Sequence, residues 1–236
     1  MGVRDPLVIA VVQPECADYD VATNAARHAA AVRAADARVV VFPELSLTGY
    51  HLDAPTIAPD DPRLGPLVEA CAETGAIALA GAPVAGEDGR SCIGVLAFGG
   101  DGAKLAYRKI CLGGTETDRF SPGSEPAVVA VDGWRLGLAV CRDMGVPEHA
   151  ARTAALDIDA YVAGTLEAAP DRPIQEDRAR RVATEYGVWV AVASFAGSTG
   201  GGYASAAGHS GIWSADGILV AQAGPEAGLI ARATLT

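Results

Sequence analysis

Residues 136–148 read LGLAVCRDMGVPE, an apolar run that stops at Cys141 and continues into a short polar turn and a proline. The run predicts a buried strand, and Pro147 predicts the first turn of a helix. A turn at the end of a strand exposes the side chain there, whereas a structural cysteine would more often lie within the run. The stretch therefore indicates that Cys141 is a catalytic nucleophile. A core cysteine at a strand end is the alternative that the local pattern leaves open.

A nucleophilic thiol needs activation, because a free cysteine is mostly protonated at neutral pH. A helix that starts just after Cys141 would lower the pKa of the thiol through its unpaired N–H groups and its dipole. The backbone N–H of Arg142 would point to the place where an oxyanion forms. The stretch thus predicts a low thiol pKa and one oxyanion donor, and the base must come from elsewhere in the chain.

Two other charged residues also follow predicted strands. Glu44 comes directly after an apolar run and Pro43, and partial desolvation there would raise the pKa of its carboxyl toward neutrality, as a general base requires. Lys109 lies at another strand end, where an ammonium would hold a thiolate or an oxyanion. Each residue alone also fits a solvated loop or edge charge. Together with the thiol they indicate a cysteine nucleophile that has a glutamate base and a lysine.

Three blocks of the sequence carry a resemblance to a known family. They are FPELSLTGY at residues 42–50, YRKI at residues 107–110 and CRDMGVPE at residues 141–148. In this order they resemble the signature blocks of the nitrilase superfamily, the carbon–nitrogen hydrolases. Further segments, at residues 120–123, 178–185 and 208–212, are similar to other family segments, so the resemblance covers nearly the whole chain.

The resemblance implies a fold, a mechanism and a set of site residues. The fold would be α/β, a four-layer α-β-β-α sandwich of two mixed sheets between outer helices, formed by residues 1–236 as one carbon–nitrogen hydrolase domain. Glu44 would be the general base, Lys109 would stabilise the tetrahedral intermediate and Cys141 would form a thioester. Glu116 would be the second family glutamate, which orients substrate or assists proton transfer. No metal and no organic cofactor is implied, and a homo-oligomer, a dimer or larger, is expected.

Departures from the family pattern narrow the expected substrate. Cys141, Arg142 and Asp143 stand where nitrilases carry Cys-Trp-Glu, and this triplet is similar to that of the amidase branches. Gly145 stands where many amidases and carbamoylases have an arginine, which in carbamoylases binds the substrate carboxylate. We expect Arg142 to bind substrate in its place.

The expected activity is the hydrolysis of a small linear carboxamide to acid and ammonia, as by an amidase or an ω-amidase. Tyr50 and Tyr203 would line the substrate pocket. The alternatives are an N-carbamoyl amine hydrolase, a nitrilase and an acyl transferase that uses an amine acceptor. An alternative from another class is a catalytically silent interaction protein of the same fold.

The composition argues against several classes of function. The chain has 236 residues and a formal net charge of −11, which disfavours a nucleic-acid partner because a phosphate backbone needs a basic surface. The four histidines are scattered and the five cysteines form no CxxC pair, so no metal site is expected. The sequence shows neither a secretory signal pattern nor an apolar run of about 20 residues, the length of a membrane span. We therefore expect a cytoplasmic protein with reduced thiols.

Hydrophobic patterning predicts strands that alternate with helices early in the chain, and hairpins in its middle and at its end. The predicted strands cover residues 7–12, 38–42, 76–81, 92–98, 103–108, 127–131, 134–141, 160–163, 188–194, 210–213, 218–223 and 229–235. The predicted helices cover residues 20–35, 63–74, 147–156 and 174–186. Residues 44–62, 112–125 and 197–208 are predicted loops. The third loop is rich in glycine and favours a pocket rim over a phosphate-binding loop, because it lacks a GK[ST] motif.

Overall fold

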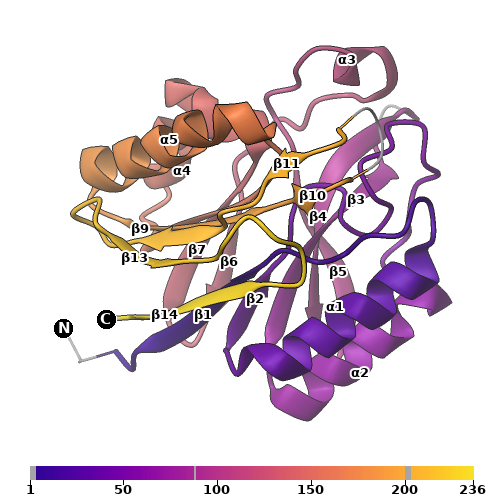
Figure 1. Ribbon diagram of the computed structural model, residues 1–236, viewed down its shortest axis with the longest axis horizontal. Helices are drawn as coiled ribbons and strands as arrows, with labels where there is room; N and C mark the ends of the chain where they lie inside the picture. Colours follow the sequence, from indigo (N-terminus) through magenta and orange to yellow (C-terminus); the bar gives the residue numbers. More distant parts are fainter. Residues whose placement is uncertain (1–3, 88, 200–202) are drawn as a thin grey trace.

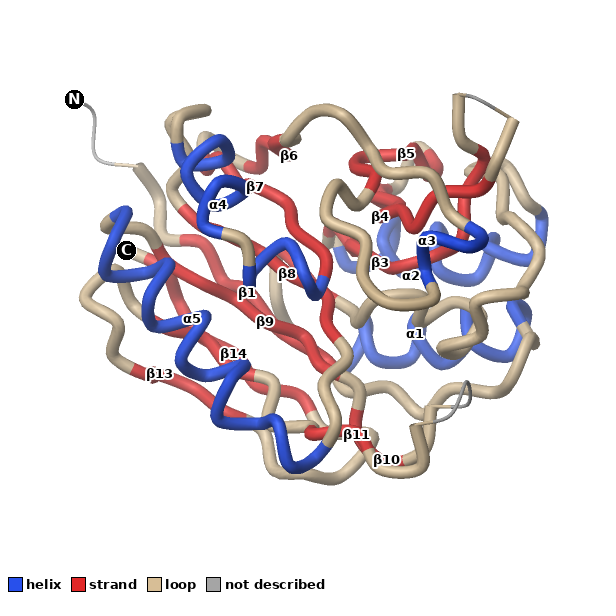
Figure 2. Tube along the Cα trace, turned by 90° about the horizontal axis from the view of Figure 1, so that it is seen from above, coloured by secondary structure: helices blue, strands red, loops and turns tan. Residues whose placement is uncertain are grey.

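The fold has four layers, in which two six-stranded sheets face each other and helices cover their outer sides (Figure 1). The structure is a computed structural model that describes residues 4–87, 89–199 and 203–236. In Figure 2 the helices α4 and α5 lie on the opposite side of the strands from α1 and α2. This arrangement confirms the α/β sandwich of two mixed sheets that the sequence predicts.

The first sheet has the strand order β14-β1-β2-β3-β4-β5. Its strands are β1 (Leu7–Val12), β2 (Val39–Val41), β3 (Ile77–Ala85), β4 (Ser91–Gly99), β5 (Gly102–Arg108) and β14 (Ile230–Leu235). β1, β2 and β3 are parallel, and β4, β5 and β14 pair antiparallel at the two sides. The last strand of the chain pairs with the first, so that Leu7 lies opposite Leu235.

The second sheet has the order β13-β12-β9-β8-β7-β6. Its strands are β6 (Val128–Val131), β7 (Trp134–Val140), β8 (Ala160–Thr165), β9 (Trp189–Ser194), β12 (Gly211–Trp213) and β13 (Leu219–Gln222). β7, β8 and β9 are parallel, as β1, β2 and β3 are in the first sheet. Parallel strands are buried on both faces, which explains why the sequence of this part of the chain shows continuous apolar runs.

Helices pack on the outer face of each sheet. α1 (Val21–Ala35) and α2 (Gly65–Thr74) share an apolar cluster with the first sheet, and α4 (Pro147–Ala154) and α5 (Arg172–Tyr186) share one with the second. The short elements are α3 (Glu116–Arg119), β10 (Ala196–Gly197), β11 (Ala206–Ala207) and the 3₁₀ helices η1 (Pro62–Leu64), η2 (Cys141–Gly145) and η3 (Ala169–Asp171). None of the helices in the described ranges is both long and apolar enough to cross a membrane.

Alternation along the strands divides the core into layers. Ile9 and Val11 of β1 point between the sheets, where they join Leu136 and Leu138 of β7 in one cluster. Ala10, between the first two, instead belongs to the cluster under α1 and α2. Both sheets are therefore apolar on both faces, and the two strand ends that carry Glu44 and Cys141 approach each other across the middle layer.

Local signals set the ends of α1 and α5. The carboxylate of Asp20 accepts a hydrogen bond from the backbone N–H of Thr23 at 3.0 Å, which caps the start of α1. Asp36 has a φ of 44° just after α1, and Gly187 has a φ of 63° just after α5. Both are left-handed residues that end a helix, and glycine takes this conformation most readily.

Three segments show the main differences from the prediction. Residues 112–125, predicted as a loop, contain the short helix α3. β3 continues beyond Gly81 to Ala85, because its last residues pair with the start of β4. The glycine-rich loop at residues 197–208 contains one residue of β10 and both residues of β11, and its residues Gly200, Gly201 and Gly202 lie outside the described residues.

Candidate active site

Glu44 lies in a turn that two glycines allow to pack between the sheets. A Cβ atom on Gly81 of β3 would lie 2.3 Å from the backbone nitrogen of Leu45, and one on Gly164 of β8 would lie 2.6 Å from the carbonyl oxygen of Phe42. The backbone around Glu44 therefore passes closely over one glycine of each sheet. This packing leaves Glu44 only 1% exposed.

Lys109 follows β5 and crosses to Glu44. Its backbone N–H donates to the carbonyl of Ile93 at 2.8 Å, so the first sheet holds it in register. Its Nζ atom donates to Oε1 of Glu44 at 2.7 Å and to both carboxylate oxygens of Glu116 at 2.7 and 2.9 Å. The ammonium is 1% exposed, so its charge is balanced by carboxylates rather than by water.

Glu116 is the first residue of α3, and several donors hold its carboxylate besides Lys109. Tyr50 donates its hydroxyl to Oε1 at 3.0 Å, and the backbone N–H of Gly113 donates to Oε2 at 2.8 Å. Two glutamates and one lysine thus form a closed, buried cluster. The structure brings together three of the residues that the sequence suggested for catalysis.

The electrostatics of this cluster make Glu44 a base with a pKa near neutrality. Burial raises the pKa of Glu44 from 4.5 to about 7, although the charge of Lys109 opposes the rise. Burial lowers the pKa of Lys109, but Glu44, Cys141 and Glu116 together raise it above its usual range. The ammonium therefore stays charged, and Glu44 is the group that changes protonation near pH 7. The raised pKa of Glu44 was predicted from its place at a strand end.

Oε2 of Glu44 is buried and has no hydrogen-bond partner among the described residues. Its other oxygen is occupied by Lys109. A buried carboxylate oxygen without a donor is costly, so such an atom in a native site calls for an explanation. Its lone pairs are open to a hydrogen-bond donor that enters the site.

Cys141 is the first residue of η2, directly after β7, and it has a φ of 44°. This left-handed conformation is strained for a cysteine and turns the chain sharply at the end of the strand. Its Sγ atom donates to the carbonyl oxygen of Leu166 at 3.3 Å. The turn therefore points the thiol to the end of the neighbouring strand β8.

The predicted low pKa of the Cys141 thiol was wrong. Burial raises the pKa of Cys141, and the negative charge of Glu44 raises it further, while Lys109 lowers it only in part. A 3₁₀ helix of five residues follows the cysteine, and the α-helix α4 starts only at Pro147. The thiol is therefore protonated at neutral pH.

A pocket of about 320 Å³ joins the thiol to the lysine cluster. It is lined by Lys109, Glu116 and Cys141, and also by the three residues predicted to bind substrate, which are Tyr50, Arg142 and Tyr203. The rings of Tyr50 and Tyr203 meet edge to face, with centroids 5.3 Å apart. Glu44 does not line the pocket, but it contacts Lys109, which does.

Arg142 is exposed at this pocket, where its side chain passes over Gly113. A Cβ atom on Gly113 would lie 3.0 Å from Cδ of Arg142, so the glycine leaves room for the arginine. Among the described residues no carboxylate forms an ion pair with Arg142. The pocket therefore offers one guanidinium that a ligand anion would neutralise.

Two charged pocket residues were not assigned to the site from the sequence. Arg178 of α5 forms an ion pair with Glu167, which follows Leu166 directly. A Cβ atom on Gly145 would lie 3.2 Å from Cζ of Arg178, so the guanidinium fills the space that Gly145 leaves. The helix at residues 174–186 was predicted, but no local pattern shows which of its arginines faces the pocket.

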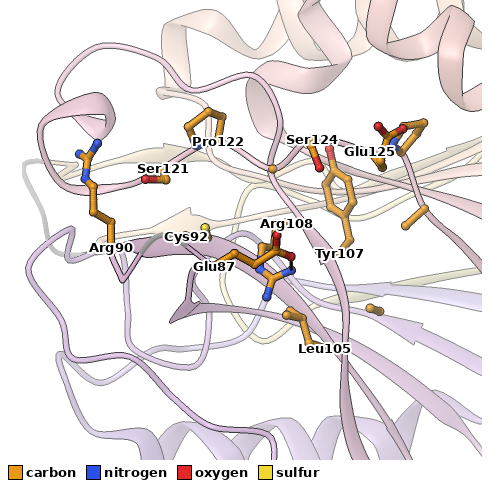
Figure 3. Close-up of a pocket in the computed structure, with 14 residues that line it drawn as sticks. Glu87, Arg90, Cys92, Leu105, Tyr107, Arg108, Ser121, Pro122, Ser124 and Glu125 are labelled. Carbon is orange, nitrogen blue, oxygen red and sulfur yellow. Dashed lines mark hydrogen bonds and ion pairs between the residues drawn. The ribbon is translucent and has the colours of Figure 1, made fainter.

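A larger cavity of about 730 Å³ is lined by residues of β5 and by residues 121–127 (Figure 3). Its lining includes Glu87, Arg108 and Glu125 but none of the glutamate, lysine and cysteine residues of the smaller pocket. We take the smaller pocket as the candidate active site, because it holds the thiol and the buried lysine. In the described ranges no group of three or more His, Cys, Asp or Glu residues could hold a metal ion.

The chain is similar to proteins of one enzyme family. Residues 8–235 match the family model "Carbon-nitrogen hydrolase". The chain is 30% identical over 231 residues to a Pseudomonas protegens protein described as "Hydrolase in pqqF 5'region", a match that covers 94% of this chain and 80% of that one. It is 30% identical over 173 residues to an (R)-stereoselective amidase of a Pseudomonas species, and this match covers 70% of this chain and 62% of the amidase. The crystal structure of Saccharomyces cerevisiae Nit3, a member of branch 10 of the nitrilase superfamily, superposes with a TM-score of 0.86 at 26% identity, covering 98% and 90% of the two chains.

Proposed function

The chain belongs to the carbon–nitrogen hydrolase family, and on this basis we propose that it hydrolyses a small linear carboxamide to a carboxylic acid and ammonia. The reaction would pass through a thioester on Cys141. The observation that carries the proposal is the buried ammonium of Lys109, held between two carboxylates and lining the same pocket as the thiol. A catalytically silent protein would have no need to keep three buried charges beside an accessible cysteine, since such burial is costly.

In the proposed first half-reaction, Oε2 of Glu44 accepts the thiol proton while Sγ of Cys141 attacks the carbonyl carbon of the amide. The carbonyl oxygen becomes an oxyanion, which the ammonium of Lys109 and the backbone N–H of Arg142 stabilise. When the carbon–nitrogen bond breaks, the leaving nitrogen takes the proton from Glu44 and departs as ammonia. The acyl group stays on sulfur as a thioester.

In the second half-reaction, water takes the place of ammonia. Glu44 accepts a proton from this water as its oxygen attacks the thioester carbon. The tetrahedral intermediate then releases the acid, and Cys141 regains its proton from Glu44. Glu116 holds Lys109 in place throughout, because its carboxylate contacts the ammonium through both oxygens.

The pocket supports a small acyl group with an anionic far end. Its volume of about 320 Å³ fits a short linear chain. Arg142 is the guanidinium at the pocket that has no carboxylate partner among the described residues, while the protein as a whole has a net charge of −11. A terminal carboxylate on the substrate would pair with it, as in an ω-amide.

The direct test is ammonia release from a panel of compounds by the purified protein. The panel contains short aliphatic amides, ω-amides, N-carbamoyl amines and nitriles of equal chain length. We expect turnover of amides, with the highest kcat/KM for ω-amides, and intact mass should show an acyl adduct on the protein. The variant Cys141→Ala should release no ammonia and form no adduct while its circular dichroism stays unchanged.

Three results would refute the proposal in different ways. A preference for carbamoyl amines or nitriles over amides would move the protein to another branch of the family. Turnover by Cys141→Ala would exclude the thioester. Failure to turn over any compound, together with no faster alkylation of Cys141 by iodoacetamide than of the other four cysteines, would favour a silent interaction protein.

A further inference from the structure

A chain of buried hydrogen bonds runs behind the nucleophile, and the proposed reaction steps do not use it. The hydroxyl of Tyr107 donates to Oδ2 of Asp143 at 2.8 Å, and the same oxygen of Tyr107 lies 2.8 Å from Nε2 of His149. On the other side of the ring, Nδ1 of His149 lies 2.9 Å from the hydroxyl of Tyr161. All four side chains are at most 3% exposed.

The direction of each bond follows from counting protons. Tyr107 has one hydroxyl proton, and Asp143 receives it, so Nε2 of His149 must carry the proton of the next bond. Burial lowers the pKa of His149, so the ring is neutral at pH 7 and Nδ1 has no proton. Tyr161 therefore donates to Nδ1. The chain of donors runs from Tyr161 through His149 and Tyr107 to Asp143.

Asp143 joins the backbone beside Lys109 to the backbone beside Cys141. Its Oδ1 atom accepts from the N–H of Cys111 at 2.8 Å, and its Oδ2 atom accepts from the N–H of Val140 at 2.9 Å. Val140 precedes the nucleophile, and Cys111 is two residues after the lysine. One carboxylate thus binds both strand ends.

Tyr107 adds a second connection to the strand end of the lysine. It lies on β5 two residues before Lys109, and its hydroxyl oxygen also accepts from the N–H of Ile110 at 3.3 Å. The oxygen is therefore saturated, with two donors and one acceptor. The hydroxyl that holds Asp143 thus also binds the backbone directly after Lys109.

We propose that Asp143 and Tyr107 form a positioning pair that sets the distance between the ammonium of Lys109 and the thiol of Cys141. The proposal rests on the amide hydrolysis proposed above and adds two residues to it. Neither residue touches the reacting atoms, because both lie behind the turn at Cys141. Their effect on the reaction is geometric, since the attack needs the thiol and the ammonium on the same carbonyl group.

The test compares two variants, each of which removes one of the two tyrosine hydroxyls that are hydrogen-bonded to the ring of His149. Tyr107→Phe breaks the hydrogen bonds to Asp143 and His149. Tyr161→Phe breaks only the hydrogen bond to Nδ1 of His149, and the Oγ1 atom of Thr153 remains 3.5 Å from that nitrogen. Tyr107→Phe also removes the acceptor of the Ile110 N–H, so we expect it to lower the melting temperature more than Tyr161→Phe does, and kcat is measured at a temperature where both variants are folded. For Tyr107→Phe we expect kcat to fall roughly 10- to 100-fold with KM within about threefold, because a displacement near 1 Å has that effect on attack. For Tyr161→Phe we expect kcat within about threefold of wild type.

Equal losses of kcat in the two variants would show that the network is merely structural and would overturn the proposal. If Tyr107→Phe does not fold, the isosteric variant Asp143→Asn takes its place, and an unchanged kcat in that variant would equally overturn the proposal. Alkylation of Cys141 by iodoacetamide, followed by intact mass, separates this proposal from the proposed function. A wild-type chain that is alkylated at Cys141 but hydrolyses no amide refutes the function alone. The labelling rate should then still differ by about threefold or more between the two tyrosine variants, and equal rates would overturn the positioning pair.

Discussion

The close contact between Gly81 and the turn of Glu44 predicts that a single methyl group impairs catalysis from a distance. The Cβ of alanine at position 81 would lie 2.3 Å from the backbone nitrogen of Leu45, 2.6 Å from the carbonyl oxygen of Pro43 and 2.8 Å from the carbonyl carbon of Glu44. All three neighbours are backbone atoms, so no side chain can rotate away. To reach an ordinary contact of 3.4 Å, the turn must move by about 1.1 Å.

Two effects of Gly81→Ala follow from this displacement. Overpacking of this kind destabilises a protein by about 1–3 kcal/mol. For a chain of this size that corresponds to a fall in Tm of roughly 2–4 °C per kcal/mol. The turn also carries Glu44, and a misplacement of about 1 Å costs on the order of 100-fold in rate. We therefore expect kcat/KM to fall far more than the loss of stability alone would cause.

Gly99→Ala is the matched control, because position 99 ends β4 and a Cβ there would meet only Cδ1 of Ile77, at an ordinary contact distance of 3.4 Å. We therefore expect unchanged activity and a stability close to that of the wild type. Urea unfolding measures the stabilities, and ammonia release measures kcat/KM at a temperature where both variants are folded. A destabilised Gly81→Ala that keeps the wild-type kcat/KM would refute the idea that this contact positions Glu44.

Three further predictions concern the charges of the site. Lys109→Met leaves Glu44 and Glu116 buried without their cation. Urea unfolding should show a loss of about 3–5 kcal/mol in the free energy of unfolding at pH 7, and a smaller loss at pH 5. Burial raises the pKa of Glu44 from 4.5 to about 7, so this residue stabilises the fold below pH 4.5, and its contribution is lost as the pH rises through 7. The free energy of unfolding of the wild type, relative to that of Glu44→Gln, should therefore fall by about 3 kcal/mol between pH 4 and pH 8, and a difference that does not change with pH would contradict the pKa shift. The wild-type kcat/KM should rise with pH through about 7. Arg142→Gln should lower kcat/KM for ω-amides about 10- to 100-fold and leave neutral amides unchanged, and an equal loss for both would exclude a carboxylate contact.

Sequence reasoning selected the candidate residues whose signal was local. Glu44, Lys109 and Cys141 each follow a predicted strand. Only the structure shows that these strands, β2 and β5 of the first sheet and β7 of the second, end close to one another. The same reasoning predicted the raised pKa of Glu44, since a carboxylate at the end of a buried strand loses water whatever lies opposite it.

The parts that failed depend on contacts between distant segments. The pKa of the Cys141 thiol was predicted to be low from the helix that follows, but burial and the charge of Glu44 outweigh that effect. The ion pair of Arg178 with Glu167, and the space that Gly145 leaves for it, arise from the packing of α5 on η2. Periodicity reports which face of a helix is apolar, but it does not report which arginine reaches a pocket.

The pairing of β1 with β14 has a consequence for how the chain comes to be folded. Leu7 of β1 is synthesised well before its partner Leu235, because all the strands of the second sheet lie between the two in the sequence. Until β14 has been made, one edge of β1 has no neighbouring strand and can pair with other chains. The first sheet is therefore completed only after the strands of the second sheet have been synthesised, which makes this edge a place where a chaperone or an aggregate would bind the nascent protein.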